Sequence, residues 1–180
     1  MADSVFDPQS FMETQFAGNL DTSYVNVPPG EGLAQISGVK LSQIDFPNIG
    51  GSGVRCELTW KLVEGSPFFA EAVATTGMKE PTVSQQFLLD GDVVDGRFKL
   101  DLGVNKNMRL KHVVEATGLN KSKHWNFGSL THQTAHVKVE HSAMINKAKQ
   151  PLLDDDGKPR FRAEVTRVTS IDKARAKAAA

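Results

Sequence analysis

A strict alternation of apolar and polar side chains over residues 54–62 constrains the fold of this chain more than any other feature. The apolar set is Val54, Cys56, Leu58, Trp60 and Leu62. Because successive side chains of a β-strand point to opposite faces, this spacing predicts a strand with one buried face.

A second strand is expected just before it, over residues 33–44. Its apolar positions are less regular, and Gly38 marks a β-bulge within it. The loop between the two segments, residues 47–53, is rich in glycine. We therefore predict an antiparallel pair of strands joined by a tight connection.

Short strands are also predicted at residues 83–89 and 97–102, on either side of a turn at residues 90–92. Residues 66–81, an Ala-rich stretch with two Phe, fit neither period clearly. Further on, alternation returns at residues 135–139 and 161–165, which predicts a hairpin with a long polar tip.

The period changes to that of a helix between residues 105 and 118. Asn105 is a suitable N-cap, and Gly118 suits the position just past the last helical residue. Leu110, Val113 and Val114 would share one face. We predict a short helix of about three turns.

Three strand regions, a helix and two final strands form the element order of the OB-fold, a mainly β, five-stranded barrel with its helix between the third and fourth strands. The chain has 180 residues, which suits one domain with tails. We therefore expect an N-terminal arm at residues 1–31, an OB-like domain at residues 32–171 and a basic, Ala-rich tail at residues 172–180, either disordered or a frayed helix. Three Phe of the arm are expected to dock on the domain or on a neighbouring subunit: Phe6, Phe11 and Phe16.

Composition excludes several classes of protein. No apolar run approaches the roughly 20 residues that span a bilayer. The N-terminus lacks the basic and apolar regions of a secretory signal. Cys56 is the single cysteine, so an intramolecular disulfide and a cysteine-based zinc site are both excluded. A reducing, cytoplasmic setting is expected.

The formal net charge of +0 hides a strong asymmetry along the chain. Residues 1–90 carry 4 Lys and Arg against 11 Asp and Glu, whereas residues 91–180 carry 17 against 10. The second half therefore has a net charge of +7, which indicates a polyanion partner. The competing interpretation is that the two halves fold together and neutralise each other.

Motifs for catalysis and metal binding are missing. The sequence contains no nucleophile elbow, phosphate loop or paired-histidine zinc motif. His132 and His136 would lie about 13 Å apart on a strand, too far to hold one ion. The acidic run at residues 154–156 lacks the spacing of a calcium loop and is better explained as a hairpin tip. We expect a protein that is not an enzyme and has no cofactor.

The segment NKSKHWNFGSL, residues 120–130, interleaves cations with aromatic rings. Its candidate nucleic-acid ligands are Lys121, Lys123, His124, Trp125 and Phe127. Cations neutralise phosphates, and bases stack on exposed rings. The competing interpretation is that the two rings are core residues, since large aromatic side chains dominate cores.

Other basic residues of the predicted strands would extend such a surface. Over residues 97–149 there are 10 Lys and Arg against 3 Asp and Glu, which favours polyanion binding. The further candidate ligands are Arg97, Lys99, Lys138, Arg160, Phe161 and Arg162.

The second half also resembles a known family. FKLDLGVNKNMRLKHVVEATGL, WNFGSL, AHVKVEH and DGKPRFRAEVTRVTSI are similar to segments of small phage-encoded proteins that resemble OB-type single-stranded-DNA-binding proteins. The similarity spans residues 28–171. It implies a non-sequence-specific single-stranded-DNA-binding protein of phage DNA replication or recombination, located in the host cytoplasm. It also implies phage recombinase or replication proteins as partners, and a homo-oligomer.

A structural role is the alternative. A virion decoration or tail component, or another protein-interaction protein, would use the Phe-bearing arm between subunits and would not bind nucleic acid.

Overall fold

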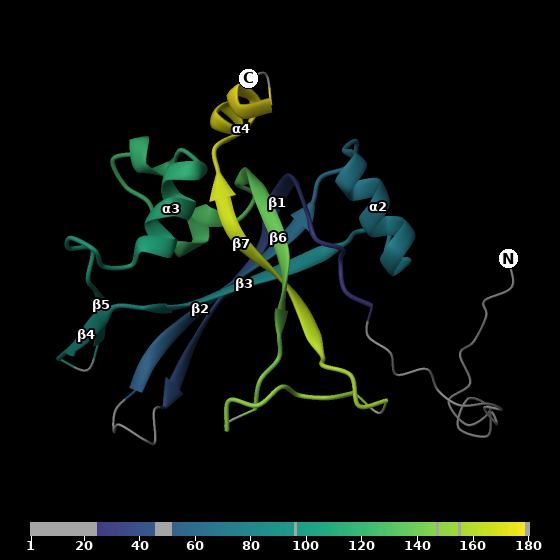
Figure 1. Cartoon of the computed structure of the whole chain (residues 1–180). Helices are drawn as coiled ribbons and strands as arrows, with labels where there is room; N and C mark the ends of the chain where they lie inside the picture. Colours follow the sequence, from purple (N-terminus) through teal and green to yellow (C-terminus); the bar gives the residue numbers. More distant parts are fainter. Residues whose placement is uncertain (1–24, 46–51, 96, 147, 155, 179–180) are drawn as a thin grey trace, which may run out of the picture.

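The computed structural model describes residues 25–45, 52–95, 97–146, 148–154 and 156–178. The predictions for Phe6, Phe11 and Phe16, and for most of the loop after the first strand, lie outside these residues. The described chain is mainly β (Figure 1), as its alternating patterns predict.

Five strands form one sheet that closes on itself. Its strands, in the order of their hydrogen-bonded neighbours, are β1 (Gly30–Asp45), β2 (Ser52–Leu62), β3 (Thr82–Leu89), β7 (Phe161–Thr169) and β6 (Thr134–Ala143), which pairs again with β1. The predicted antiparallel pairs β1–β2 and β6–β7 are both confirmed. β3 and β7 run parallel and meet at one pair of residues, Ser84 and Glu164.

The long strand β1 makes this closure, because it pairs with two neighbours. Its first part pairs with β6 and its later part with β2, and Ala34 and Gln35 pair on both sides. The register against β2 shifts between Ile36 and Gly38, which confirms the predicted bulge. A bulge bends its strand and increases the local twist, as a closing sheet requires.

The inward side chains of the alternating strands form the core. Cys56, Leu58 and Trp60 of β2 are each fully buried. The indole Nε1 of Trp60 donates a hydrogen bond of 3.0 Å to Oε1 of Gln85, a buried polar residue of β3. A polar group inside a core needs such a partner, since an unpaired one would lose its hydration without replacement.

Helix α2 (Pro67–Thr76) occupies the stretch whose period was ambiguous. Ser66 caps it by accepting a hydrogen bond from the Phe69 amide, and Pro67 occupies the first turn, where no donor is needed. Its Phe68 ring lies so close to Gly30 of β1 that a Cβ on this glycine would come within 2.4 Å of the ring. Most residues of α2 are apolar, so its sequence has no distinct polar face from which a helical period could be read.

Along the chain, helix α3 (Met108–Ala116) follows β3 and the two short strands after it and precedes β6. Its residues Leu110, Val113 and Val114 are buried as predicted. The predicted N-cap is wrong: Asn107, not Asn105, holds that position. The Asn107 side chain is buried between Asp90 and Asp101, accepting from the Asp90 amide and donating to both backbone carbonyls. Asn107 therefore ties the start of α3 to the end of β3.

A small separate sheet follows β3. It consists of β4 (Gly91–Val94) and β5 (Arg97–Leu100), paired antiparallel. The predicted turn at residues 90–92 is wrong, because the chain continues as a strand there. Gly91 permits the close approach of this hairpin, since a Cβ would meet the Lys99 carbonyl oxygen and the Phe98 ring.

The chain ends in helix α4 (Ile171–Ala178), in the stretch expected to be a tail. It stands at the end of β7, opposite the loop that joins β6 to β7 (Figure 1). Two short 3-10 helices, η1 (Leu119–Lys121) and η2 (Phe127–Leu130), connect α3 to β6. Among the described residues, no helix is both long and apolar enough to cross a membrane.

Leu58→Ala should destabilise the protein by about 2–5 kcal/mol, because the side chain is fully buried and its removal leaves a cavity. Urea unfolding followed by circular dichroism measures this change. Leu88→Ala is the control, since Leu88 lies on the neighbouring strand but is 53% exposed, and should change the free energy of unfolding by less than about 0.5 kcal/mol. Equal losses for both variants would contradict the packing described here.

The Cys56 thiol should be unreactive in the native protein. Burial, with a smaller contribution from the Glu57 charge, raises the pKa of Cys56 to about 12, and the thiolate is the reactive form. We expect a chromogenic disulfide reagent at pH 8 to modify Cys56 only after urea is added. Rapid modification without denaturant would show that the sheet opens at β2.

Candidate nucleic-acid interface

The residues predicted to contact nucleic acid fall into three separate parts of the structure. Five lie on the connection between α3 and β6: Lys121, Lys123, His124, Trp125 and Phe127. Two lie on β5 of the small sheet: Arg97 and Lys99. Four lie on the β6–β7 hairpin: Lys138, Arg160, Phe161 and Arg162.

On the α3–β6 connection, the cations and the rings have different surroundings. Lys121, Lys123 and His124 are exposed. Trp125 and Phe127 are half-buried, pack against the core, and meet edge to face with ring centroids 6.2 Å apart. A reciprocal pair of hydrogen bonds between Asn126 and Ser129 shapes the turn that holds the rings. Both rings therefore contribute to packing, and neither is free on both faces.

Arg97 and Lys99 are exposed, but they belong to the β4–β5 sheet and not to the closed sheet. In the register of that sheet, Lys99 lies opposite Asp92 and Arg97 opposite Val94. The predicted alternation is correct, whereas its location on a strand of the main sheet is wrong.

Two predicted cations of the hairpin are already paired with carboxylates. Lys138 Nζ lies 2.6 Å from Glu140, and the Arg162 guanidinium lies 3.1 Å from Glu164, each partner two positions along its own strand. The hydrogen bond from Lys138 lowers the pKa of Glu140. Ser142 Oγ also donates to Glu164, at 2.7 Å. The outer face of β6 and β7 thus carries both signs of charge in close pairs.

The β6–β7 loop, residues 144–160, is long, as predicted, but it is less polar than predicted. Backbone hydrogen bonds join Met144, Leu152 and Arg160. Ile145 and Leu153 are exposed apolar side chains of this loop. The Asp154 carboxylate accepts from the amides of residues 156 and 158, and so shapes the hairpin tip as expected.

Arg160, Phe161 and Arg162 are all exposed where this loop joins β7. The Phe161 side chain is 46% exposed and is the one aromatic ring among the strongly exposed apolar residues of the described chain. The Asn26 side chain holds this point of β7, donating to the Phe161 carbonyl and accepting from the Ala163 amide. The ring thus projects from a fixed backbone.

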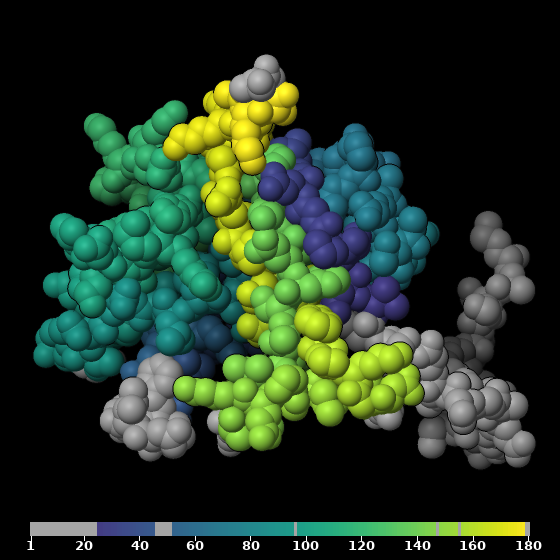
Figure 2. Space-filling view, viewed as in Figure 1, coloured from purple at the N-terminus to yellow at the C-terminus, as the bar shows by residue number. Residues whose placement is uncertain are grey.

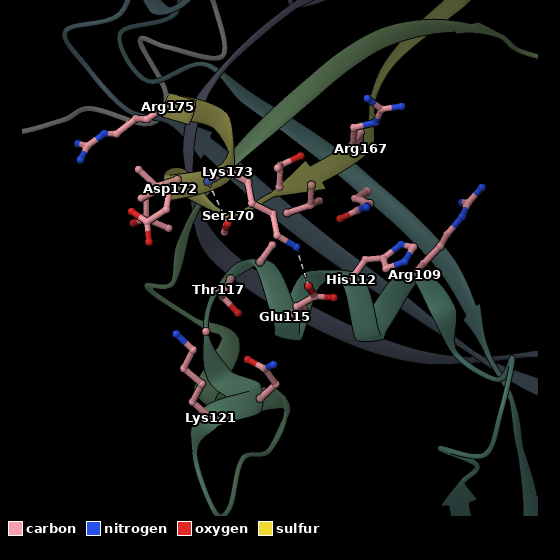
Figure 3. Close-up of a pocket in the computed structure, with 18 of the residues that line it drawn as sticks. Arg109, His112, Glu115, Thr117, Lys121, Arg167, Ser170, Asp172, Lys173 and Arg175 are labelled. Carbon is pink, nitrogen blue, oxygen red and sulfur yellow. Dashed lines mark hydrogen bonds and ion pairs between the residues drawn. The ribbon is translucent and has the colours of Figure 1, made fainter. Parts of the chain in front are cut away.

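A cleft of about 1020 Å³ lies between α3, the end of β7 and α4. Figure 3 shows Arg109, His112 and Arg167 toward one end of it, and Arg175 and Lys121 toward the other. The basic side chains that line it are Arg109, His112, Lys121, Arg167, Lys173 and Arg175, and the acidic ones are Glu115 and Asp172.

One ion pair spans this cleft. Lys173 Nζ of α4 donates to Glu115 Oε1 of α3 at 2.9 Å, which lowers the pKa of Glu115. The pair ties α4 to α3 across the cleft. Of the lining cations, sequence reasoning found only Lys121. The spacing of three between Arg109 and His112 places both on the polar face of the predicted helix, a signal that could have indicated these two residues but not the cations of β7 and α4.

No metal centre is evident in the part of the chain that the structure describes, where no three His, Cys, Asp or Glu side chains gather closely enough to hold an ion. His136 lies on β6, whereas His132 precedes that strand at a positive φ of 68°.

The half-buried ring of Trp125 and the exposed ring of Phe161 should contribute differently to the stability of the fold. We expect Trp125→Ala to lower the free energy of unfolding by about 1–3 kcal/mol, because its ring packs against the core and against Phe127. Phe161→Ala should lower it by less than about 1 kcal/mol, since that ring is largely in solvent. Thermal denaturation of the two variants measures the difference, and the reverse order would contradict these positions.

Comparison of the chain with protein-family models found no match, and a search of curated proteins also found none. These comparisons neither support nor contradict the resemblance to phage single-stranded-DNA-binding proteins, which stays a prediction.

Proposed function

We propose that this chain is an OB-type protein that binds single-stranded DNA without sequence specificity and acts in phage DNA replication or recombination. The closed order β1-β2-β3-β7-β6, with α3 between β3 and β6, supports the OB assignment. Faces of OB barrels commonly bind single strands, but a fold alone does not determine function.

The observation that carries this proposal is the exposed triplet Arg160, Phe161 and Arg162. A guanidinium neutralises phosphates, while a ring exposed on one face lets a base stack on it. Phe161 is the first choice for stacking, because Trp125 and Phe127 are engaged with the core. Stacking needs only the π-face that every base has, so little sequence preference is expected.

Lys121, Lys123 and His124 would add phosphate contacts on the α3–β6 connection, where all three are exposed. Lys138 and Arg162 would contribute less than their formal charges, because Glu140 and Glu164 offset them. Replication or recombination proteins of the phage, and further copies of the chain, are the partners that this role implies.

A structural or protein-interaction role is the second candidate. The exposed Ile145 and Leu153 of the β6–β7 loop favour it, because exposed apolar side chains on one segment can mark a protein contact. Sedimentation distinguishes the two roles, since a large discrete assembly indifferent to nucleic acid would favour the structural one.

Titration of fluorescently labelled oligo-dT with the full chain, followed by anisotropy, tests the proposal. We expect binding that weakens steeply with salt, with a slope of log K against log salt of about −2.8 for four phosphate contacts. Absence of binding at low salt, or binding indifferent to salt, would overturn the proposal.

Phe161→Ala should weaken that binding by roughly 5- to 150-fold, the loss of one stacked base. Leu153→Ala is the matched control, since it removes an exposed apolar side chain from the loop that precedes Phe161 but no ring. The same anisotropy titration compares the two variants. If both bind as the unaltered chain does, Phe161 is not a stacking residue.

A further inference from the structure

We infer that the cleft between α3, β7 and α4 binds the phosphodiester backbone of the same single strand, and so extends the contact that begins at Phe161. This inference rests on the proposed function. It assigns a binding role to Arg109, Arg167 and Arg175, three residues outside the predicted interface.

β7 connects the two places. Phe161 is its first residue, and Thr166 to Thr169, at its other end, line the cleft. Nine residues at about 3.3 Å each give β7 a length of about 30 Å. OB-fold sites cover about 4–16 nucleotides, so one strand can reach both ends. In Figure 2, β7 and α4 form a yellow band on one face, beside the teal and green atoms of the α3 region.

Among the described residues, three cations of the cleft are free of bonded partners, whereas Lys138 and Arg162 of the hairpin are paired with carboxylates. Within the described ranges, the side chains of Lys121, Arg167 and Arg175 make no hydrogen bond or ion pair. Arg109 donates only to the neutral Gln86 carbonyl, at 3.2 Å. Lys173 is occupied by Glu115. The cleft therefore keeps uncompensated positive charge that a polyanion can neutralise.

The remaining lining residues favour a phosphate ligand over an apolar one. The polar residues Thr117, Thr166, Thr169 and Ser170 line the cleft between the cations. The Thr117 hydroxyl donates to the Val113 carbonyl, and the Thr166 hydroxyl donates to the Lys138 carbonyl. Small-molecule pockets of this volume are usually lined by hydrophobic and aromatic side chains. Here Ala116, Val168 and Ile171 are the apolar side chains on the wall.

The positions of the cations also fit an extended ligand. Arg109 and Arg167 come from different elements but lie at the same end of the cleft, and Lys121 and Arg175 mark the other (Figure 3). A single compact anion would need its ligands to converge on one point. Cations spread along a groove instead suit successive phosphates of a backbone.

The test uses a double variant that carries both Arg109→Ala and Arg167→Ala. A control double variant loses the same charge elsewhere. Lys40→Ala with Lys79→Ala is that control, because both lysines are exposed and far from the cleft lining. Anisotropy with labelled oligo-dT gives affinities over a range of salt. We expect the cleft variant to bind about tenfold more weakly and its salt slope to fall by about 1.4, the contribution of two phosphates. The control should keep the slope of the unaltered chain.

The outcomes separate this inference from the proposed function. If the unaltered chain does not bind oligo-dT, the proposed function fails. If it binds and the cleft variant keeps the slope of the control, the cleft inference alone is wrong. Loss of the Arg109 bond to Gln86 removes a contact between α3 and β3, so Arg175→Ala provides a second variant. Its exposed side chain lies outside the predicted interface and has no partner among the described residues. It must reduce the slope by about 0.7, the contribution of one phosphate.

Discussion

The two-sided pairing of β1 is the interaction on which the rest of the structure depends. β1 pairs with β6 before its bulge and with β2 from Ala34 onward, so one strand joins the two ends of the sheet. Closure turns the apolar faces of all five strands inward and removes most strand edges. It also determines where everything else can lie: α3 and α4 meet at one end of β7, and the β6–β7 loop extends from the other (Figure 1).

Closure of the sheet brings charged side chains into ion pairs and into a cluster of cations that the linear sequence does not show. Neighbours two apart on one strand share a face, so Lys138 pairs with Glu140 and Arg162 with Glu164. The cations of α3 are far in sequence from those of β7 and α4 and meet them only through the fold, where Glu115 and Asp172 are the acidic residues among them. The neutral total of the chain therefore conceals a cleft with a surplus of positive charge.

Sequence reasoning found the elements that carry a clear period and missed those that do not. The alternation at Cys56, Leu58 and Trp60 predicted β2, and the irregular strand with Gly38 predicted the bulged β1. β4 was missed because Asp90, Gly91 and Asp92 have the composition of a turn. The cleft could not be predicted, because its walls come from three elements and one of them, α4, was expected to be a tail.

The central claim is that a single strand of nucleic acid follows β7 from Phe161 to the cleft. Amide chemical shifts of the isotopically labelled chain, recorded during titration with oligo-dT, test it most directly. The account predicts a continuous set of perturbed amides along β7 and into α4, together with Arg109 and His112 of α3, while α2 stays unperturbed. Perturbations confined to α2, or none at all under low salt, would contradict it.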